Sequence, residues 1–385
     1  MKKIRVGLIF GGKSGEHEVS LVSARSIFNA LDKGKYDVKL IGIDKEGVFR
    51  LGKPQDFWLN PENTKKIALN KQKSEEIIFS GNFIKSAKNG KNITNIDVAF
   101  PITHGTFGED GCLQGFLELL NIAYVGSGVL GSSVGMDKDV MKRLFRDAGI
   151  LTARFYAPKK FEIYPHTNKD NFSSPVNKKN IGVGVNKKYL DKIIKDLKFP
   201  IFVKPANLGS SVGISKAHNK KELEMAIVDA FGYDTKIILE EYIKGREIEC
   251  SVLGNDNPIV SKPGEIKLQS EFYSYDAKYI NDSDAIGVPV ANLPRDVIRK
   301  IRETAIKVFE TLECSGMGRV DFFLTKNGKL YANEINTLPG FTSISMYPKM
   351  WEQSGIPYSK LLDKLIQLAL EKKKEKNKLK RNFKL

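Results

Sequence analysis

Two short apolar segments near the C-terminus, joined by a turn, constrain the fold most strongly. Residues 318–324 and 329–335 are rich in aromatic and aliphatic side chains that favour strands. Between them, residues 325–329 read TKNGK, and Asn-Gly at such a place is typical of a β-hairpin turn. The sequence therefore predicts an antiparallel pair of strands in this region.

Polar side chains occupy alternate positions of this predicted hairpin. Arg319 and Asp321 share one face of the first strand, and Glu334 and Asn336 share one face of the second. Pairing the strands therefore brings a cation and three oxygen donors to one surface. Carboxylates and an amide carbonyl are donors that Mg²⁺ prefers when it also contacts substrate phosphates. The alternative is a half-buried hairpin with a simple salt bridge. That alternative does not explain why the polar residues of both strands are spaced to share one face.

The rest of the chain is long enough for two or three domains and predicts further sheets. The predicted strands lie at 5–10, 38–43 and 96–100 in a small open α/β sheet, at 199–204, 214–216 and 237–241 in a second sheet, and at 247–253 beside the hairpin in a third. A short antiparallel excursion is expected within 47–91. Glycines at 126–131 indicate a hinge-like connection, and the composition of 159–186 predicts an insertion or mobile loop.

The composition excludes several classes of protein. The net charge is +17, but much of the excess lies in a C-terminal tail and in Lys/Asn-rich stretches, without a nucleic-acid-binding motif beside them. Cys112, Cys250 and Cys314 are scattered, which favours a reducing cytosol over a disulfide framework or a zinc site. There is no apolar run of membrane-spanning length and no signal-peptide pattern. We therefore expect a cytoplasmic protein with no nucleic-acid partner and no membrane insertion.

One motif in the first strand is misleading. Residues 7–14, GLIFGGKS, match the formal P-loop pattern and include Lys13. Three of the four variable positions are Leu, Ile and Phe, which belong in a strand and not in a loop around a phosphate. We interpret the match as a coincidence. A P-loop phosphotransferase is the alternative that depends on it, and a Rossmann dehydrogenase is weak because G-x-G-x-x-G is absent.

Five motifs in order along the chain resemble those of the D-alanine–D-alanine ligases, within the ATP-grasp superfamily. They are GEHEVS at 15–20, HGTFGEDG at 104–111, KPANLGSSVG at 204–213, YDAKY at 275–279 and the hairpin with its TLPG extension. The resemblance extends over nearly the whole chain. It implies α/β and α+β structure in a three-domain ATP-grasp fold with an N-terminal Rossmann-like, pre-ATP-grasp domain.

The resemblance also implies domain boundaries. The N-terminal substrate domain would span 1–125, the central ATP-grasp subdomain 126–241, and the C-terminal subdomain with the metal site 242–371. A basic tail would follow at 372–385.

The activity implied by the resemblance is the ATP-dependent ligation of two D-alanines. The first D-alanine would attack the γ-phosphate of ATP to give an acyl phosphate, and the amine of the second would then displace phosphate. The product would enter peptidoglycan precursor synthesis, and a homodimer is expected. Ligases that use D-lactate or D-serine as the second substrate are the alternative within the superfamily.

For the metals, the resemblance implies two Mg²⁺ ions, for which Mn²⁺ can substitute, held by Asp321, Glu334 and Asn336. Arg319 and the backbone N–H of Gly340 would stabilise the acyl phosphate and then the tetrahedral oxyanion.

For ATP, the resemblance assigns the loop 209–213, where small residues let backbone N–H groups approach phosphate oxygens. Lys204 and Lys138 would be the phosphate lysines, Glu240 would accept the adenine amino group, and Glu247 would bind the ribose. The ATP set is completed by Ser210, Ser211, Glu241, Tyr242, Ile243, Phe272, Phe323 and Asn333.

For the amino acids, Glu16 would bind the substrate ammonium, with Glu18 as the alternative carboxylate. Ser210 and Tyr279 would hydrogen-bond with Glu16 and close the pocket. The implied catalytic set is Glu16, Ser210, Lys278, Tyr279, Arg319 and Gly340, and the implied substrate-binding set is Glu16, His104, Ser345 and Met346.

Overall fold

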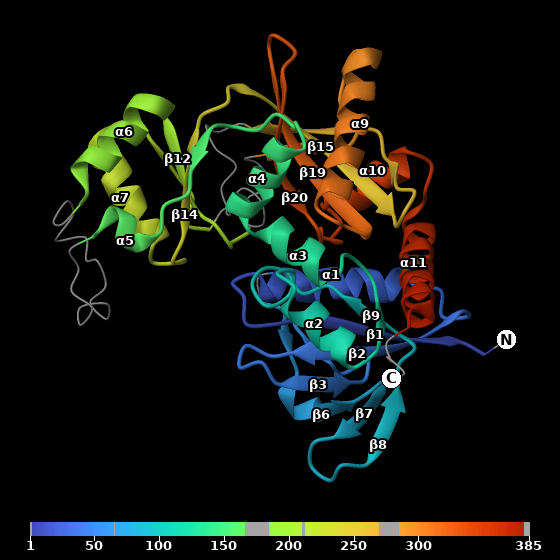
Figure 1. Cartoon of the computed structure of the whole chain (residues 1–385). Coiled ribbons are helices and arrows are strands. Elements are labelled where there is room, and N and C mark those ends of the chain that lie inside the picture. The colour runs from blue at the N-terminus through green and yellow to red at the C-terminus, as the bar shows by residue number, and fades with distance from the viewer. Residues whose placement is uncertain (1, 65, 166–184, 210–211, 269–284, 381–385) are drawn as a thin grey trace.

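A computed structural model describes residues 2–64, 66–165, 185–209, 212–268 and 285–380. An eight-stranded sheet forms the N-terminal part of the molecule (Figure 1). Its strands, in spatial order, are β10 (Ala123–Tyr124), β9 (Val98–Pro101), β1 (Ile4–Gly11), β2 (Tyr36–Ile43), β3 (Phe49–Gly52), β6 (Ser74–Ser80), β7 (Phe83–Ser86) and β8 (Asn92–Asn95). The first four are parallel and the others antiparallel, which confirms the predicted open sheet with an antiparallel excursion.

The alternation of side chains in β1 explains why helices cover both faces of this sheet. Val6, Leu8 and Phe10 point into a cluster with α1 (His17–Ala30), whereas Ile9 points into a cluster with α2 (Cys112–Leu119). Strands that are buried on both faces read as continuous apolar runs, as this one does.

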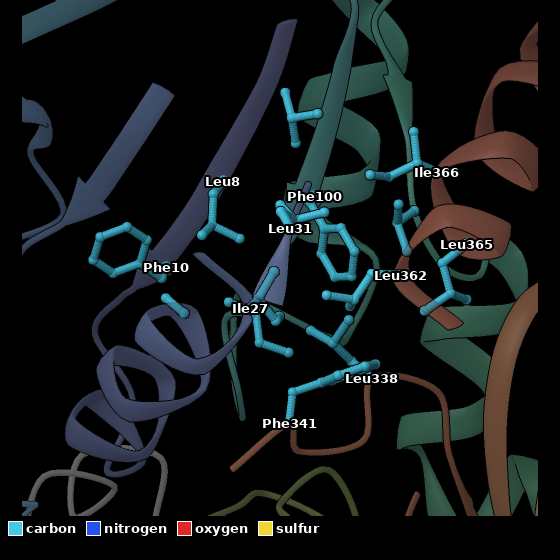
Figure 2. Packing of buried hydrophobic residues seen from close by; sticks show 14 of the residues in the cluster. Leu8, Phe10, Ile27, Leu31, Phe100, Leu338, Phe341, Leu362, Leu365 and Ile366 are labelled. Atoms are coloured by element: carbon cyan, nitrogen blue, oxygen red, sulfur yellow. The ribbon is translucent and has the colours of Figure 1, made fainter. Parts of the chain in front are cut away.

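The C-terminal helix α11 (Tyr358–Lys378) returns to the N-terminal sheet. Leu362, Leu365 and Ile366 of this helix join Leu8 and Phe100 in one buried cluster (Figure 2). The last domain was predicted to end at residue 371, with a basic tail after it, but the helix continues for seven more residues. The first part of the predicted tail, up to Lys378, is therefore helical, as the continuation of a helix that packs against the core.

A four-stranded antiparallel sheet forms the central part, in the order β11 (Phe155–Tyr156), β14 (Ile237–Glu241), β12 (Ile201–Pro205) and β13 (Ser215–Ala217). Helices α6 (Lys187–Leu197) and α7 (Lys220–Ala230) share a buried cluster with it. The predicted loop at 159–186 begins with the short helix α5 (Lys160–Ile163), where Glu162 accepts a hydrogen bond from the N–H of Lys159. Its residues 166–184 lie outside the described part of the chain.

The C-terminal part is a six-stranded sheet that contains the predicted hairpin. Its strands are β18 (Ala285–Val288), β17 (Gly264–Leu268), β15 (Gly245–Gly254), β19 (Gly316–Thr325) and β20 (Leu330–Asn336), with β16 (Ile259–Val260) beside β15. Helices α9 (Arg295–Thr311) and α10 (Met346–Gln353) pack on it. Two further strands, β4 (Trp58–Leu59) and β5 (Ala68–Leu69), pair with each other near a 3-10 turn, Lys71–Lys73.

The segment predicted as a glycine hinge is a short non-helical stretch at 126–128 that leads directly into a helix. This helix, α3 (Val129–Met136), is followed by α4 (Lys138–Asp147). Both helices contact β20, and Met141 and Phe145 of α4 lie in the core of the C-terminal sheet. Gly131 is needed there, because a Cβ would lie 2.7 Å from the backbone oxygen of Glu313. None of the helices in the described residues has the length and hydropathy of a membrane-spanning segment.

Candidate active site

The β19–β20 hairpin places the predicted polar residues on one surface. Arg319 lies opposite Asn336, and Asp321 lies opposite Glu334, so that all four side chains share a face. The Arg319 guanidinium donates two hydrogen bonds of 2.7 Å to the Asp321 carboxylate. The predicted hairpin and its common polar surface are therefore confirmed.

This surface offers oxygen donors suited to a divalent cation. Asp321 and Glu334 are adjacent carboxylates on paired strands, and Asn336 adds an amide oxygen, which now accepts the N–H of Leu338 at 2.9 Å. In the described part of the chain, no cluster of three His, Cys, Asp or Glu side chains is arranged to hold a metal. Two carboxylates and an amide still fit Mg²⁺, because that ion keeps water and substrate oxygens as its other ligands.

Three buried lysines lie between this hairpin and the central sheet. Lys138 donates to the carbonyl of Leu208 at 2.8 Å, and its Nζ lies 3.5 Å from the Glu334 carboxylate. Lys142, one turn later on α4, donates to the carbonyl of Asn333 at 2.9 Å. Lys204 comes from β12 and is also buried. Elements far apart in sequence thus converge on one strongly basic site.

Glu240 on β14 holds two of these lysines in place. Its carboxylate lies 2.6 Å from Lys204 Nζ and 3.1 Å from Lys142 Nζ. Burial opposes ionisation of Glu240, but the two lysines outweigh it and lower its pKa to about 2. Burial lowers the pKa of Lys142, whereas Glu240 and Glu334 outweigh burial at Lys204 and raise its pKa. The Glu240 carboxylate predicted to meet adenine is therefore fixed by lysines.

The strand end that follows Glu240 is the predicted adenine segment. Both carboxylate oxygens of Glu241 accept hydrogen bonds from Arg154, at 2.8 Å from its backbone N–H and 2.7 Å from its Nε. The ring of Tyr242 lies 6.0 Å from that of Phe202, and Lys216 Nζ lies 4.5 Å from its centroid. Glu241 thus faces Arg154, whereas Tyr242 stays half-exposed beside a cation.

Three further predicted ATP residues lie on or next to the C-terminal sheet. Ile243 precedes β15 and is half-buried. Glu247 on β15 lies opposite Phe323 on β19, as expected for residues that line one side of a nucleotide.

Glu16 enters the site from the N-terminal domain. It is 7% exposed, and a Cβ at Gly105 would lie 2.9 Å from its Oε2. A Cβ at Gly209 would lie 3.5 Å from the same oxygen and 3.4 Å from Oε1 of Glu109. The glycines therefore allow loops of two domains to approach two carboxylates closely. Burial and the neighbouring Glu16 raise the pKa of Glu109 well above its ordinary value.

His104 connects the N-terminal and C-terminal parts. Its Nε2 lies 3.3 Å from Oγ of Ser23, and the same Oγ accepts a hydrogen bond from the N–H of Phe341 at 3.4 Å. Burial lowers the pKa of His104, which favours a neutral imidazole near pH 7. These contacts hold the first and last parts of the chain together, and the substrate-binding role implied for His104 stays a prediction. Glu18 forms an ion pair with Lys45 at 2.7 Å, whereas Glu16 is the carboxylate that faces Gly209.

The loop after the hairpin brings Gly340 next to Ser345. A Cβ at Gly340 would lie 2.8 Å from Oγ of Ser345, which accepts a hydrogen bond from the N–H of Thr342 at 3.0 Å. The Met346 side chain is buried with Ile266 and Met350. Met346 therefore offers the site its backbone N–H, in the first turn of α10, and not its side chain.

Several predicted residues lie outside the part of the chain that the structure describes: Ser210, Ser211, Phe272, Lys278 and Tyr279. Their positions relative to Glu16 and Arg319 remain predictions.

Two residues at this site were not predicted. Lys142 follows Lys138 by four positions, which is one helical turn, and this spacing is the indication that the sequence contains. Glu249 on β15 lies opposite Asp321, and its Oε1 is 3.3 Å from Nε of Arg319. It follows Glu247 by two positions, so strand alternation places both carboxylates on one face.

The P-loop match is a coincidence, as predicted. Residues up to Gly11 belong to β1, so they cannot wrap a phosphate. The N–H of Gly11 donates to Oγ of Ser20 at 2.7 Å, and the N–H of Gly12 donates to the carbonyl of Ile43 at 2.8 Å. Two of the N–H groups that a P-loop would offer to phosphate are therefore already used.

Comparisons with known proteins agree over nearly the whole chain. The family models "D-ala D-ala ligase N-terminus" and "D-ala D-ala ligase C-terminus" match residues 5–127 and 175–367. The D-alanine--D-alanine ligase of Oceanobacillus iheyensis is 46% identical over 99% of this chain and 98% of its own length. The D-alanine--D-alanine ligase A of Chromobacterium violaceum is 48% identical over 97% of this chain and 96% of its own.

Solved structures of similar proteins extend this agreement to the fold. The D-alanine-D-alanine ligase from Coxiella burnetii has a TM-score of 0.79 and 36% identity, covering 98% of this chain and 97% of that one. A D-Ala:D-Ser ligase from Enterococcus faecalis has a TM-score of 0.80 and 35% identity, covering 96% and 100%. The Bacillus anthracis D-alanine--D-alanine ligase complexed with ATP has a TM-score of 0.67 and 31% identity, covering 98% and 100%.

Proposed function

The chain belongs to the D-alanine–D-alanine ligase family of the ATP-grasp superfamily, and we propose how its site performs the reaction of that family. The chain joins two D-alanines at the expense of ATP. The converging lysines and the acidic hairpin carry out this ligation through an acyl phosphate. One observation supports the assignment most strongly. Lys138 and Glu334, from α4 and β20, approach within 3.5 Å, so that cationic and metal-binding groups face one another across one site. A triphosphate with its metal ions requires both kinds of group.

The lysines bind and orient ATP in this proposal. Lys138 and Lys204 contact the phosphates, and Glu240 fixes Lys204 and Lys142 before the nucleotide arrives. Tyr242, Ile243 and Phe323 line the base, and Glu247 takes the ribose. Asp321, Glu334 and Asn336 would hold two Mg²⁺ ions, or Mn²⁺, which would neutralise charge on the transferred phosphoryl group.

Arg319 and Gly340 act on the acyl centre. Glu16 holds the ammonium of the first D-alanine, whose carboxylate attacks the γ-phosphate. Arg319 is oriented by Asp321 and Glu249 and stabilises the acyl phosphate, and the N–H of Gly340 joins it at the tetrahedral oxyanion.

The second D-alanine lies near the start of α10. The backbone N–H of Met346 and the hydroxyl of Ser345 are placed to bind its carboxylate, since helix N-termini attract anions. Its amine then attacks the acyl carbon, and phosphate leaves.

The biological setting is part of the same proposal. We propose domains at 1–125, 126–241 and 242–371, a homodimer, a cytoplasmic location and a role in peptidoglycan precursor synthesis. The family models that match 5–127 and 175–367 support the separation of the first domain from the rest, and the free thiols of Cys112, Cys250 and Cys314 fit a reducing compartment.

A panel of second substrates tests the function. The enzyme with ATP, Mg²⁺ and D-alanine is offered D-alanine, D-serine, D-lactate or L-alanine, and products are identified by mass. We expect D-alanyl-D-alanine as the main product, with stoichiometric phosphate release. A main product that contains D-serine or D-lactate would contradict the proposed specificity.

A further inference from the structure

A cavity of about 290 Å³ lies on the reverse side of the loop that carries His104 and Glu109. It opens at the carboxyl ends of β1 and β9, on the α2 side of the N-terminal sheet, whereas Glu16 begins the helix on the opposite face. The strand order reverses between β1 and β9. The chain passes from β1 to its neighbour β2 on one side, and from β9 to its neighbour β10 on the other side. Ligands of open α/β sheets bind in such crevices.

The walls of the cavity are aromatic and aliphatic. Phe49 and Phe116 stack with ring centroids 5.6 Å apart at 27°, and Ile43 and Leu113 also line the space. A small apolar body is therefore the part of a ligand that this cavity accommodates.

Two polar groups at the cavity have no use in the proposed reaction. Thr103 lines the cavity, and its buried hydroxyl has no hydrogen-bond partner among the described residues. Lys13 also lines the cavity. Its side chain is exposed, and within the described part of the chain its ammonium forms no hydrogen bond or ion pair. Its side chain lies over Gly47, where a Cβ would be 2.3 Å from Cε. An exposed ammonium without a counter-charge, beside this apolar cavity, suits a carboxylate.

Neighbouring carboxylates do not compete for this lysine. Asp44 is held by Arg50 at 2.9 Å, and Asp110 accepts the N–H groups of Phe107 and Cys112. The N–H groups of Gly11 and Gly12 are used internally, so these two groups are not available to a phosphate. A carboxylate on an apolar body fits Lys13 and the aromatic walls better than an inorganic anion does.

We infer that this cavity is a second small-molecule site, which binds a small carboxylate with an apolar body between Lys13 and the Phe49–Phe116 pair. In a step that rests on the proposed function, occupancy changes the apparent KM for D-alanine, since the loop of Thr103 continues directly into His104 and Glu109.

Cys112 provides a reporter for this binding. It lines the cavity and is exposed, whereas Cys250 and Cys314 are buried, so iodoacetamide should label Cys112 in the native enzyme. Phenylacetate is the probe, phenylacetamide its neutral counterpart, and inorganic phosphate the control anion. Labelling is followed by intact mass and needs no substrate turnover.

We expect phenylacetate to slow the labelling of Cys112. Phenylacetamide should need roughly tenfold higher concentration, the factor expected when a charge-assisted hydrogen bond is lost at an accessible site. Lys13→Met should remove this difference, and the exposed Lys53→Met should preserve it. Equal protection by the amide, or protection by phosphate alone, would overturn the site. Protection by phenylacetate with an unchanged KM for D-alanine would keep the site and overturn its coupling to the reaction.

Discussion

At the scale of single residues, Glu240 shows how burial and charge are balanced in this site. A lone buried carboxylate would be neutral, but Lys142 and Lys204 keep it ionised. Because the folded pKa lies below the ordinary value of 4.5, its stabilising contribution is complete above about pH 4.5. That contribution is lost as the pH falls toward 2.

Replacing this carboxylate tests that balance. Glu240→Gln should lower the free energy of unfolding at pH 7 by roughly 2–4 kcal/mol, because it leaves two buried lysines without their counter-charge. The deficit relative to wild type should shrink between pH 4.5 and pH 3. Urea denaturation across this range measures both effects, with the exposed Glu76→Gln as the control. A deficit that stays constant with pH would contradict the assigned ionisation.

The metal assignment also belongs to this scale. Glu334→Gln should reduce kcat by about 10²-fold or more, because it removes one of the two proposed metal carboxylates. The melting temperature should stay near that of wild type, since Glu334 is at the surface of the site, with its side chain 29% exposed. Steady-state phosphate release and calorimetry provide the two measurements. Near-normal turnover in a normally melting variant would remove Glu334 from the metal site.

The sequence was informative about residues whose spacing follows strand geometry. Arg319, Asp321, Glu334 and Asn336 were predicted to share a face because the period of a strand is two. Lys142 was missed because a single lysine on a helix is usually solvated. Its burial results from contacts with Glu240 and with the backbone of Asn333, which only the folded chain brings together.

At the scale of elements, the conformation of β1 distinguishes between two possible nucleotide sites, the formal P-loop at 7–14 and the site that contains Lys204. Gly7 to Gly11 are strand residues, so Lys13 cannot belong to a phosphate loop. Lys13→Ala should therefore change the Kd for ATP by no more than about twofold. Lys204→Ala should weaken ATP binding by roughly tenfold or more, as the loss of a charge-assisted contact implies. Isothermal titration with a non-hydrolysable ATP analogue distinguishes them, and the reverse ranking would move the nucleotide to the first domain.

The start of α4 positions Lys138 and offers a second test at this scale. The Asp137 carboxylate accepts hydrogen bonds from the N–H groups of Asp139 and Val140 and pairs with Lys236 at 2.6 Å. Asp137→Ala should cost about 1–2 kcal/mol of unfolding free energy from the cap, and more from the ion pair. Asn219→Ala removes a cap without an ion pair and should cost less. Equal losses in chemical denaturation would show that the ion pair contributes nothing.

Elements with strong periodicity were predictable, and elements that depend on packing were not. The strands β1, β14 and β19 were placed within a few residues, because apolar runs bounded by glycine or charge indicate them. Helix α3 contains two glycines, which lower its intrinsic propensity, and it forms because Gly131 and Gly135 let it approach the C-terminal sheet. That approach is a tertiary contact that no local pattern reports.

At the scale of the whole molecule, Lys372 on α11 joins the first and last domains. Its ammonium donates to Ser315 and lies 5.6 Å from the ring centroid of Tyr124. Burial, and after it the nearby Lys376, lower its pKa to about 8. The charged form of Lys372 is therefore disfavoured in the folded state, which lowers the free energy of unfolding below about pH 8. This destabilisation disappears as the pH rises toward 10.5, the pKa of the lysine in the unfolded chain.

Removing this charge should stabilise the protein in a pH-dependent way. Lys372→Met should raise the free energy of unfolding at pH 7 by about 1–2 kcal/mol, and the gain should shrink by pH 9.5. Ser315 keeps a partner, because its hydroxyl also donates to the carbonyl of Gly126. The exposed Lys374→Met is the matched control. A gain of equal size at both pH values would indicate an effect of packing alone.

The return of α11 to the N-terminal sheet has a consequence for how the protein is made. Leu362, Leu365 and Ile366 belong to a helix that packs on β9 and β10, on the face of the sheet that also carries Leu8, yet a ribosome produces them after almost the entire chain. Domains generally fold in order as they emerge during translation. Here the first sheet to be synthesised is among the last to be completed, and its nascent form presents an apolar surface to chaperones until α11 arrives. A chain terminated before α11 would keep that part of the surface exposed.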